Sequence, residues 1–188
     1  DLKRADLDLY KSSLRPEDRW ILSRVNSLAE EITTQMEGYQ LHRIVRSISD
    51  FILEDLSRWY IQLVRPRTWI EQDDPDKLAA YATIYEVLTK LAKLMAPFTP
   101  FIAESIYQNL VRGLDENARP SVHMCDWLEG DKGLIDVRLE ESMDLVREVS
   151  MAASNARQKG GRKLRWPVSE IVIAPSKEAL DLGGLEDV

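Results

Sequence analysis

The chain has 188 residues, 44% of them hydrophobic and 30% charged, which is enough to bury the core of one or two domains. Its net charge of −7 and its pI near 5.0 exclude a protein that coats nucleic acid non-specifically, so any such contact must be local. A single cysteine, Cys125, excludes an internal disulfide and predicts a cytoplasmic location, and the apolar runs are too short to span a membrane.

The two ends of the chain predict a segment of a longer protein. The N-terminal sequence DLKRADLDLY has no Met and none of the apolar core of a signal peptide. The C-terminal sequence LGGLEDV stops in the middle of a pattern. We therefore expect residues 1–17 to be a connector from a preceding part of the protein.

Helical periodicity dominates the chain and first predicts two long helices. One spans about residues 18–37, with Pro16 at its first position and Gly38 closing it. The other spans about residues 40–63 and is expected to end at Pro66. Their apolar stripes are Trp20, Ile21, Val25, Leu28, Ile32 and Met36, and then Leu41, Ile44, Val45, Ile48, Ile52, Leu56, Tyr60 and Leu63.

Two further helices are predicted before a long irregular stretch. Pro75 opens the third, with Asp74 as its cap, and Pro97 breaks it. The fourth begins at Thr99 and runs to about Arg112. Residues 114–133 are rich in Gly, Pro, Asn and Asp and are expected to be irregular.

A fifth helix, about residues 136–159, completes the predicted fold. Its inward side chains are expected to be Leu139, Met143, Val146, Ser150, Ala153 and Ala156. The Ile-Val-Ile run in residues 170–174 predicts a strand. The pattern indicates a mostly α protein, with an antiparallel helical bundle over residues 18–160. Residues 161–188 would then form a basic junction and the start of a truncated α/β unit.

No catalytic or metal-binding constellation is visible in the sequence. His42 and His123 lack the partners that nucleophilic catalysis requires, and His123 and Cys125 offer too few ligands for zinc. Residues 73–76 are acidic, but they lack the glycine and the terminal glutamate of a calcium loop. The glycine pair at residues 160–161 does not belong to a phosphate-binding loop. We predict no catalytic residue, no metal and no cofactor in this chain.

The most informative stretch is an acid-free window at residues 149–169. The chain carries −7 overall, so removing the five positive charges of this window leaves −12 for the rest. This concentration of charge predicts a local polyanion site on a flexible junction between Gly160-Gly161 and Trp166-Pro167. Trp166 either stacks on an unpaired base or plugs the bundle against a following unit. The five basic residues are Arg157, Lys159, Arg162, Lys163 and Arg165.

A second acid-free window spans residues 57–70. Its basic residues are Arg58, Arg65 and Arg67, which we also predict to contact RNA. Trp59 is expected in the helical core. Trp69 follows the Arg-Pro-Arg sequence and either packs as a plug of the bundle or contacts the partner.

Taken together, these residues resemble the C-terminal anticodon-binding region of isoleucyl-tRNA synthetase in its archaeal and eukaryotic form. The resemblance covers nearly the whole chain, and its segments occur in the order that the family has. The matching segments are DRWILSRVNSL (18–28), DLSRWYIQLVRPRTW (55–69), LMAPFTPFIAESIYQNL (94–110), SVHMCDW (121–127) and RQKGGRKLRWPV (157–168).

The resemblance implies a parent class I ligase that attaches isoleucine to its tRNA, using ATP with magnesium. Its catalytic and editing domains would precede this chain, and the HIGH- and KMSKS-type motifs are not found here. The implied fold is the helical bundle of class I synthetases that binds the anticodon stem-loop. The implied partners are tRNA for isoleucine and those N-terminal domains, with no membrane.

Two alternatives remain at this point. The chain could come from the valyl or leucyl relative, because the first and third matching segments are shared loosely with those enzymes. A helical bundle that binds an acidic protein partner through its basic junction is the other possibility.

Overall fold

We analysed a computed structural model of the chain, which describes residues 11–69, 74–163, 165–173 and 185. The regular structure of these residues is helical. The chain divides into two compact units, Asp1–Ile135 and Asp136–Val188. Among the described residues, no helix is long and apolar enough to cross a membrane.

The first unit is built around α2 (Pro16–Glu37), which follows a short 3-10 turn, η1 (Lys11–Ser13). Pro16 occupies the first turn and Gly38 follows the last residue, as predicted. The acidic residues Glu17 and Asp18 lie in the first turn, near the positive end of the helix dipole. The stripe is confirmed from Trp20 to Ile32, all of whose members are buried.

A continuous helical segment runs from residue 41 to residue 68. It consists of α3 (Leu41–Asp50), a π-helical segment η2 (Phe51–Tyr60) and α4 (Ile61–Thr68). The prediction that Pro66 ends this helix is wrong, because the helix continues through it to Thr68. Pro66 has no backbone N–H to donate to the Gln62 carbonyl, four residues earlier. Because both residues are exposed, water can donate to that carbonyl instead.

The π-helical segment also shifts the predicted apolar stripe. A π-helix bonds residue i to residue i+5, so the positions that face inward drift relative to an α-helix. Phe51 and Val64 are buried although the stripe did not include them. Leu41 and Val45, which the stripe included, are about half exposed, but they lie in α3 before the π-helical segment, so this shift does not account for them.

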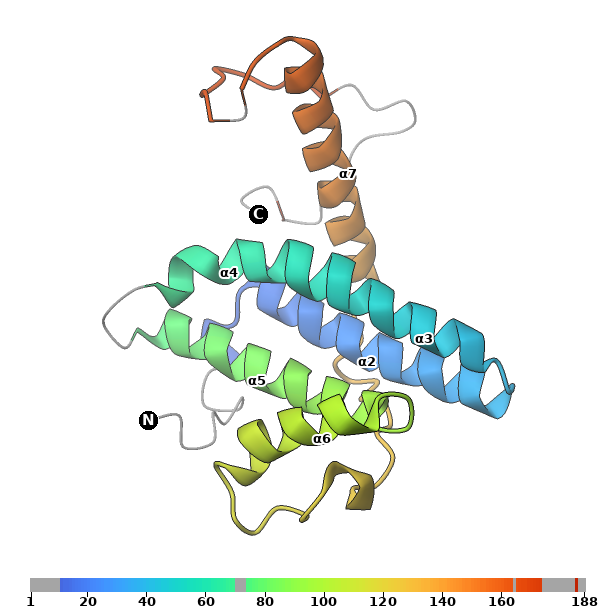
Figure 1. Cartoon of the computed structure of the whole chain (residues 1–188). Helices are drawn as coiled ribbons and strands as arrows, with labels where there is room; N and C mark the ends of the chain where they lie inside the picture. The colour runs from blue at the N-terminus through green and yellow to red at the C-terminus, as the bar shows by residue number, and fades with distance from the viewer. Residues whose placement is uncertain (1–10, 70–73, 164, 174–184, 186–188) are drawn as a thin grey trace. The chain divides into compact units, whose positions relative to one another are not determined.

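Helices α5 (Pro75–Met95) and α6 (Pro100–Tyr107) complete the bundle, and α6 continues as the π-helical η3 (Gln108–Arg112). The carboxylate of Asp74 caps α5 by accepting from the Asp76 N–H at 2.8 Å, as predicted. Figure 1 shows α2 packed between α5 and the helix that runs through α3 and α4, with α6 on the other side of α5. These contacts bury the core of the unit.

The irregular stretch after α6 is held in place by Glu104. One carboxylate oxygen of Glu104 accepts from the Ser121 hydroxyl and from the Val122 N–H, both at 2.9 Å. The other oxygen accepts from Gln108 at 2.8 Å. Burial raises the pKa of Glu104, but these hydrogen bonds lower it below its ordinary value on balance. Val122–Met124 forms the only turn of 3-10 helix, η4, in the described part of this stretch.

The second unit contains α7 (Val137–Lys159), which Asp136 caps by accepting from the Leu139 N–H at 3.1 Å. Its predicted inward stripe is correct for Met143, which is fully buried, but wrong for Ser150 and Ala156, which are exposed. The predicted strand is not formed in residues 170–173, which are exposed and have no strand partner among the described residues. Ala174 lies outside them. The division at residue 160 that the sequence favoured stays a prediction.

Candidate nucleic-acid interface

The end of α7 is a Schellman motif that places the basic junction. The N–H of Arg162 donates to the Arg157 carbonyl at 2.9 Å, and the N–H of Gly161 donates to the Gln158 carbonyl at 3.1 Å. Gly161 has φ of +66°, the left-handed conformation that this motif requires and that glycine adopts without strain. The predicted stop at Gly160-Gly161 is therefore confirmed, and the backbone turns sharply away from the helix axis.

Arg157 shapes the loop that follows. Its guanidinium donates to the Lys163 carbonyl at 3.0 Å and to the Trp166 carbonyl. The Trp166 N–H donates to the Lys163 carbonyl at 3.0 Å, so the loop closes on itself. One of the five basic residues thus donates to the backbone of the loop at Lys163 and Trp166, and the flexibility of the junction stays a prediction. Arg157 is also half-buried, which makes it a weaker candidate for direct RNA contact.

The other four basic residues of the junction are exposed: Lys159, Arg162, Lys163 and Arg165. Trp166 is 51% exposed, and the Lys163 ammonium lies 5.9 Å from the centroid of its ring. A ring that is half open to solvent is available for stacking, and the choice between base contact and packing against a following unit stays a prediction. The junction therefore presents four cations and an aromatic ring at the last residue of α7 and on the short loop that follows it.

The second predicted surface lies on the helix that ends at α4. Arg58, Gln62, Arg65 and Trp69 are all exposed, at spacings of three or four residues that place them on one face. Arg58 forms an ion pair with Glu54, one turn earlier. The Arg65 guanidinium lies over the Trp69 ring, 4.7 Å from its centroid, and Trp69 is 71% exposed. This exposure excludes the predicted alternative that Trp69 is a plug of the bundle.

Arg67 does not belong to this surface. It is buried, and its guanidinium contacts Asp18 at 2.8 Å, Glu17 at 2.9 Å and Asp76 at 2.9 Å. These contacts join the end of α4 to the first turns of α2 and α5. The prediction that Arg67 contacts RNA is inconsistent with this burial, because three carboxylates already surround the guanidinium and no phosphate can reach it.

Tyr60 completes the buried cluster by donating its hydroxyl to Asp18 at 2.7 Å. Burial raises the pKa of the Tyr60 hydroxyl, and the neighbouring Asp18 charge raises it further, so Tyr60 stays a neutral donor. Burial alone lowers the pKa of Arg67, but the hydrogen bond and charge of Asp18 outweigh it and raise the pKa above its ordinary value. Arg67 therefore stays charged and Tyr60 stays neutral at neutral pH, and the buried Nε of Arg67 has no hydrogen-bond partner among the described residues.

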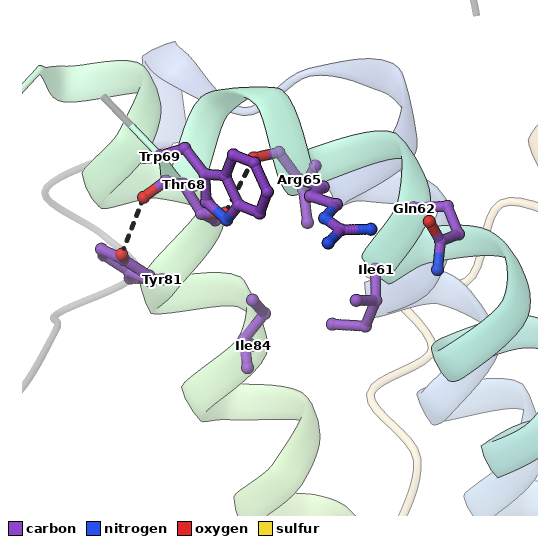
Figure 2. A pocket seen from close by; sticks show the side chains of 8 residues that line it. Ile61, Gln62, Arg65, Thr68, Trp69, Tyr81 and Ile84 are labelled. Carbon is purple, nitrogen blue, oxygen red and sulfur yellow. Dashed lines mark hydrogen bonds between the residues drawn. The ribbon is translucent and has the colours of Figure 1, made fainter. Parts of the chain in front are cut away.

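A pocket of about 490 Å³ opens beside the exposed face of α4 (Figure 2). The α4 side contributes Gln62, Arg65 and Trp69, and the α5 side contributes Tyr81 and Ile84. The Tyr81 hydroxyl donates to the Thr68 carbonyl at 3.1 Å, which ties the two sides together. Sequence reasoning missed Gln62, Tyr81 and Ile84, because Gln62 carries no charge and the two α5 residues come from a different helix.

His42 and His123 are both exposed. In that part of the chain, no group of three or more His, Cys, Asp or Glu side chains is arranged to hold a metal ion.

The described residues thus form a helical bundle with an exposed arginine–tryptophan face, and a second unit whose helix ends in an exposed cationic loop. Residues 18–173 match the family model described as the anticodon-binding domain of tRNA ligase. The chain belongs to this family of anticodon-binding domains.

Three similar proteins are isoleucine–tRNA ligases of archaea. The chain is 70% identical over 185 residues to isoleucine–tRNA ligase of Methanothrix thermoacetophila, covering 98% of this chain and 17% of that protein. It is 58% identical over 179 residues to isoleucine–tRNA ligase of Methanosarcina acetivorans, and this match covers 95% of the chain and 17% of that protein. It is 53% identical over 168 residues to isoleucine–tRNA ligase of Methanothermobacter thermautotrophicus, and this match covers 89% of the chain and 16% of that protein. The chain thus spans about one sixth of the length of these relatives.

Proposed function

We propose that this chain is the anticodon-binding part of an isoleucine–tRNA ligase and that it binds the anticodon stem-loop of isoleucine tRNA. The ligase would attach isoleucine to that tRNA in the cytoplasm, using ATP and magnesium at a catalytic domain outside this chain. The family match supports tRNA binding, and the similarity to three archaeal isoleucine–tRNA ligases supports isoleucine over valine or leucine.

The observation that carries the proposal is the exposed cationic loop at the end of α7. Lys159, Arg162, Lys163 and Arg165 are exposed in a chain of net charge −7. RNA phosphates would be attracted to this loop and repelled by most of the remaining surface. Because the Schellman motif and Arg157 fix the backbone, the charges are arranged before the RNA arrives, which reduces the entropy lost on binding.

The experiment measures tRNA binding by filter retention over a series of salt concentrations. Replacing Arg162, Lys163 and Arg165 with alanine should lower the log–log salt slope by roughly 2 to 3 units, because each phosphate contact contributes about 0.7 to 0.9 of a unit. Helical content measured by circular dichroism should be unchanged, since the three residues lie beyond α7.

A matched control removes the same charge elsewhere. Arg43, Arg46 and Arg119 are exposed and lie outside both candidate surfaces. Their replacement with alanine should leave the salt slope close to that of the unmodified chain. If the junction variant instead binds tRNA with the original slope, the site moves to the face of Arg58 and Arg65.

The amino-acid specificity of the parent enzyme needs a separate comparison. Isoleucine tRNA and valine tRNA should be tested side by side, at one salt concentration, against the same preparation. Preferential retention of isoleucine tRNA is the expected result. Equal or stronger retention of valine tRNA would contradict the assignment to the isoleucine enzyme.

A further inference from the structure

We propose that the pocket between α4 and α5 binds a single unpaired base of the RNA, which stacks on the exposed ring of Trp69. This inference rests on the proposed tRNA binding and identifies a second point of contact, separate from the cationic junction. Its ligand is a nucleobase in an unstacked segment of RNA, with the adjoining phosphate near Arg65.

The dimensions and lining of the pocket suit a planar aromatic ligand. Its volume of about 490 Å³ lies within the range of roughly 300–1,000 Å³ that is typical of small-molecule sites. Ile61, Val64 and Ile84 supply apolar walls, and Trp69 supplies a ring that is 71% exposed. Figure 2 shows Trp69 and Arg65 on one side of the open space and Ile84 on the other. An apolar wall opposite an exposed ring matches the two faces of a base.

The charge at the rim favours RNA over an apolar protein segment. Residues 57–69 contain no acidic residue, and the Arg65 guanidinium, which lines the pocket, lies over the Trp69 ring at 4.7 Å from its centroid. Aromatic rings and arginine planes are the surfaces on which proteins stack unpaired RNA bases. Gln62, which also lines the pocket, carries both hydrogen-bond donors and an acceptor and can pair with the edge of a base.

The pocket is held in shape without a ligand. The Tyr81 hydroxyl donates to the Thr68 carbonyl, and the buried Arg67 guanidinium donates to the Asp76 carbonyl at 2.9 Å. Both contacts connect the last turn of α4 to α5, and Trp69 directly follows that turn. A rigid platform loses little conformational entropy when a base stacks on it, so binding is favoured.

The test uses the 188-residue chain and an anticodon stem-loop RNA that carries 2-aminopurine at one loop position at a time. The fluorescence of 2-aminopurine changes when the base leaves its neighbours and stacks on a protein ring. With the unmodified chain, one loop position should respond on binding. With Trp69→Ala, that response should disappear, and binding should weaken by roughly 5- to 150-fold, as expected for the loss of one stacked base. Trp69→Phe should retain part of both effects.

The salt slope separates this site from the phosphate contacts. Trp69→Ala removes no charge, so its slope should equal that of the unmodified chain, whereas Arg65→Ala should lower the slope by about one unit. Phe101→Ala is the control, because Phe101 is 91% exposed and lies on α6, away from the pocket lining. It should change neither affinity nor fluorescence.

The outcomes distinguish the pocket from the function as a whole. If the unmodified chain binds the stem-loop and Trp69→Ala binds it equally well with the same fluorescence change, the pocket does not hold a base, although tRNA binding stands. If no loop position responds with the unmodified chain, the pocket is likewise excluded. If the unmodified chain shows no salt-dependent binding of the stem-loop at all, the proposed function itself fails.

Discussion

Replacing Arg67 with alanine should destabilise the bundle strongly, because it would leave a buried group of carboxylates without their cation. The Arg67 side chain is only 5% exposed and that of Asp18 is fully buried. Removing one partner of a buried ion pair costs about 3–5 kcal/mol. Domains of this kind are typically stable by about 5–15 kcal/mol, so the variant would lose a large share of its stability.

The measurement is urea unfolding followed by far-ultraviolet circular dichroism at neutral pH. Arg67→Ala should lower the midpoint, with little change in the slope against urea. Arg67→Lys should have a smaller effect, since it keeps the charge but loses the planar fork that contacts Asp18 and Glu17 together. Arg65→Ala is the control two residues away, and an exposed substitution of this kind changes stability by about 0.5 kcal/mol or less.

Two results would refute this reasoning. One is a loss of less than about 1 kcal/mol for Arg67→Ala, which would show that the buried carboxylates do not depend on the guanidinium. The other is an equal loss for Arg65→Ala, which would show that the effect is not specific to the buried cluster. A folded Arg67→Lys variant should also bind tRNA with the original salt slope, because residue 67 reaches no phosphate.

Three further substitutions test local features of the structure. Gly161→Ala should cost about 1–2 kcal/mol, because alanine is strained at φ of +66°; a higher urea midpoint would contradict the Schellman motif. Asn26→Ala should cost roughly 1–3 kcal/mol, since the buried Asn26 amide accepts from Lys90 and from the Asp131 N–H; an unchanged midpoint would show that these bonds contribute nothing. Because the pKa of Glu104 is lowered in the folded state, its ionised carboxylate stabilises the fold. This contribution is fully present at a pH above the ordinary pKa of 4.5 and is lost as the pH falls through the lower pKa of the folded state. Glu104→Gln should therefore be less stable than the unmodified chain at pH 7, and the difference should shrink in acid; a difference that is independent of pH would refute this assignment.

The helix starts could be read from the sequence because their signals are local. Pro16 in the first turn of α2 and Asp74 at the cap of α5 are both confirmed. In each case a proline or a short acidic side chain acts on backbone groups within three residues of itself. No knowledge of the tertiary structure is needed to predict such a contact.

The errors arose where the outcome depends on distant parts of the chain. The stripe on α7 failed at Ser150 and Ala156, because periodicity says which residues share a face but not whether anything covers that face. The strand predicted at residues 170–174 needs a partner strand, and residues 170–173 have none among the described residues. The pocket could not be predicted either, since Tyr81 meets the end of α4 only through the packing of two helices.

The Arg-Pro-Arg sequence shows how a single helical turn separates two roles. If Pro66 had ended the helix, both arginines would lie in an irregular turn and both could reach solvent. Because the helix continues to Thr68, Arg65 and Arg67 are separated by about 200° around its axis, at about 100° per residue. Arg65 therefore faces outward over Trp69, and Arg67 faces inward to Asp18, 49 residues away in the sequence. The inward arginine fastens the last turn of α4 to α2 and α5, and the outward arginine can present a fixed ring to RNA only because that turn is fastened.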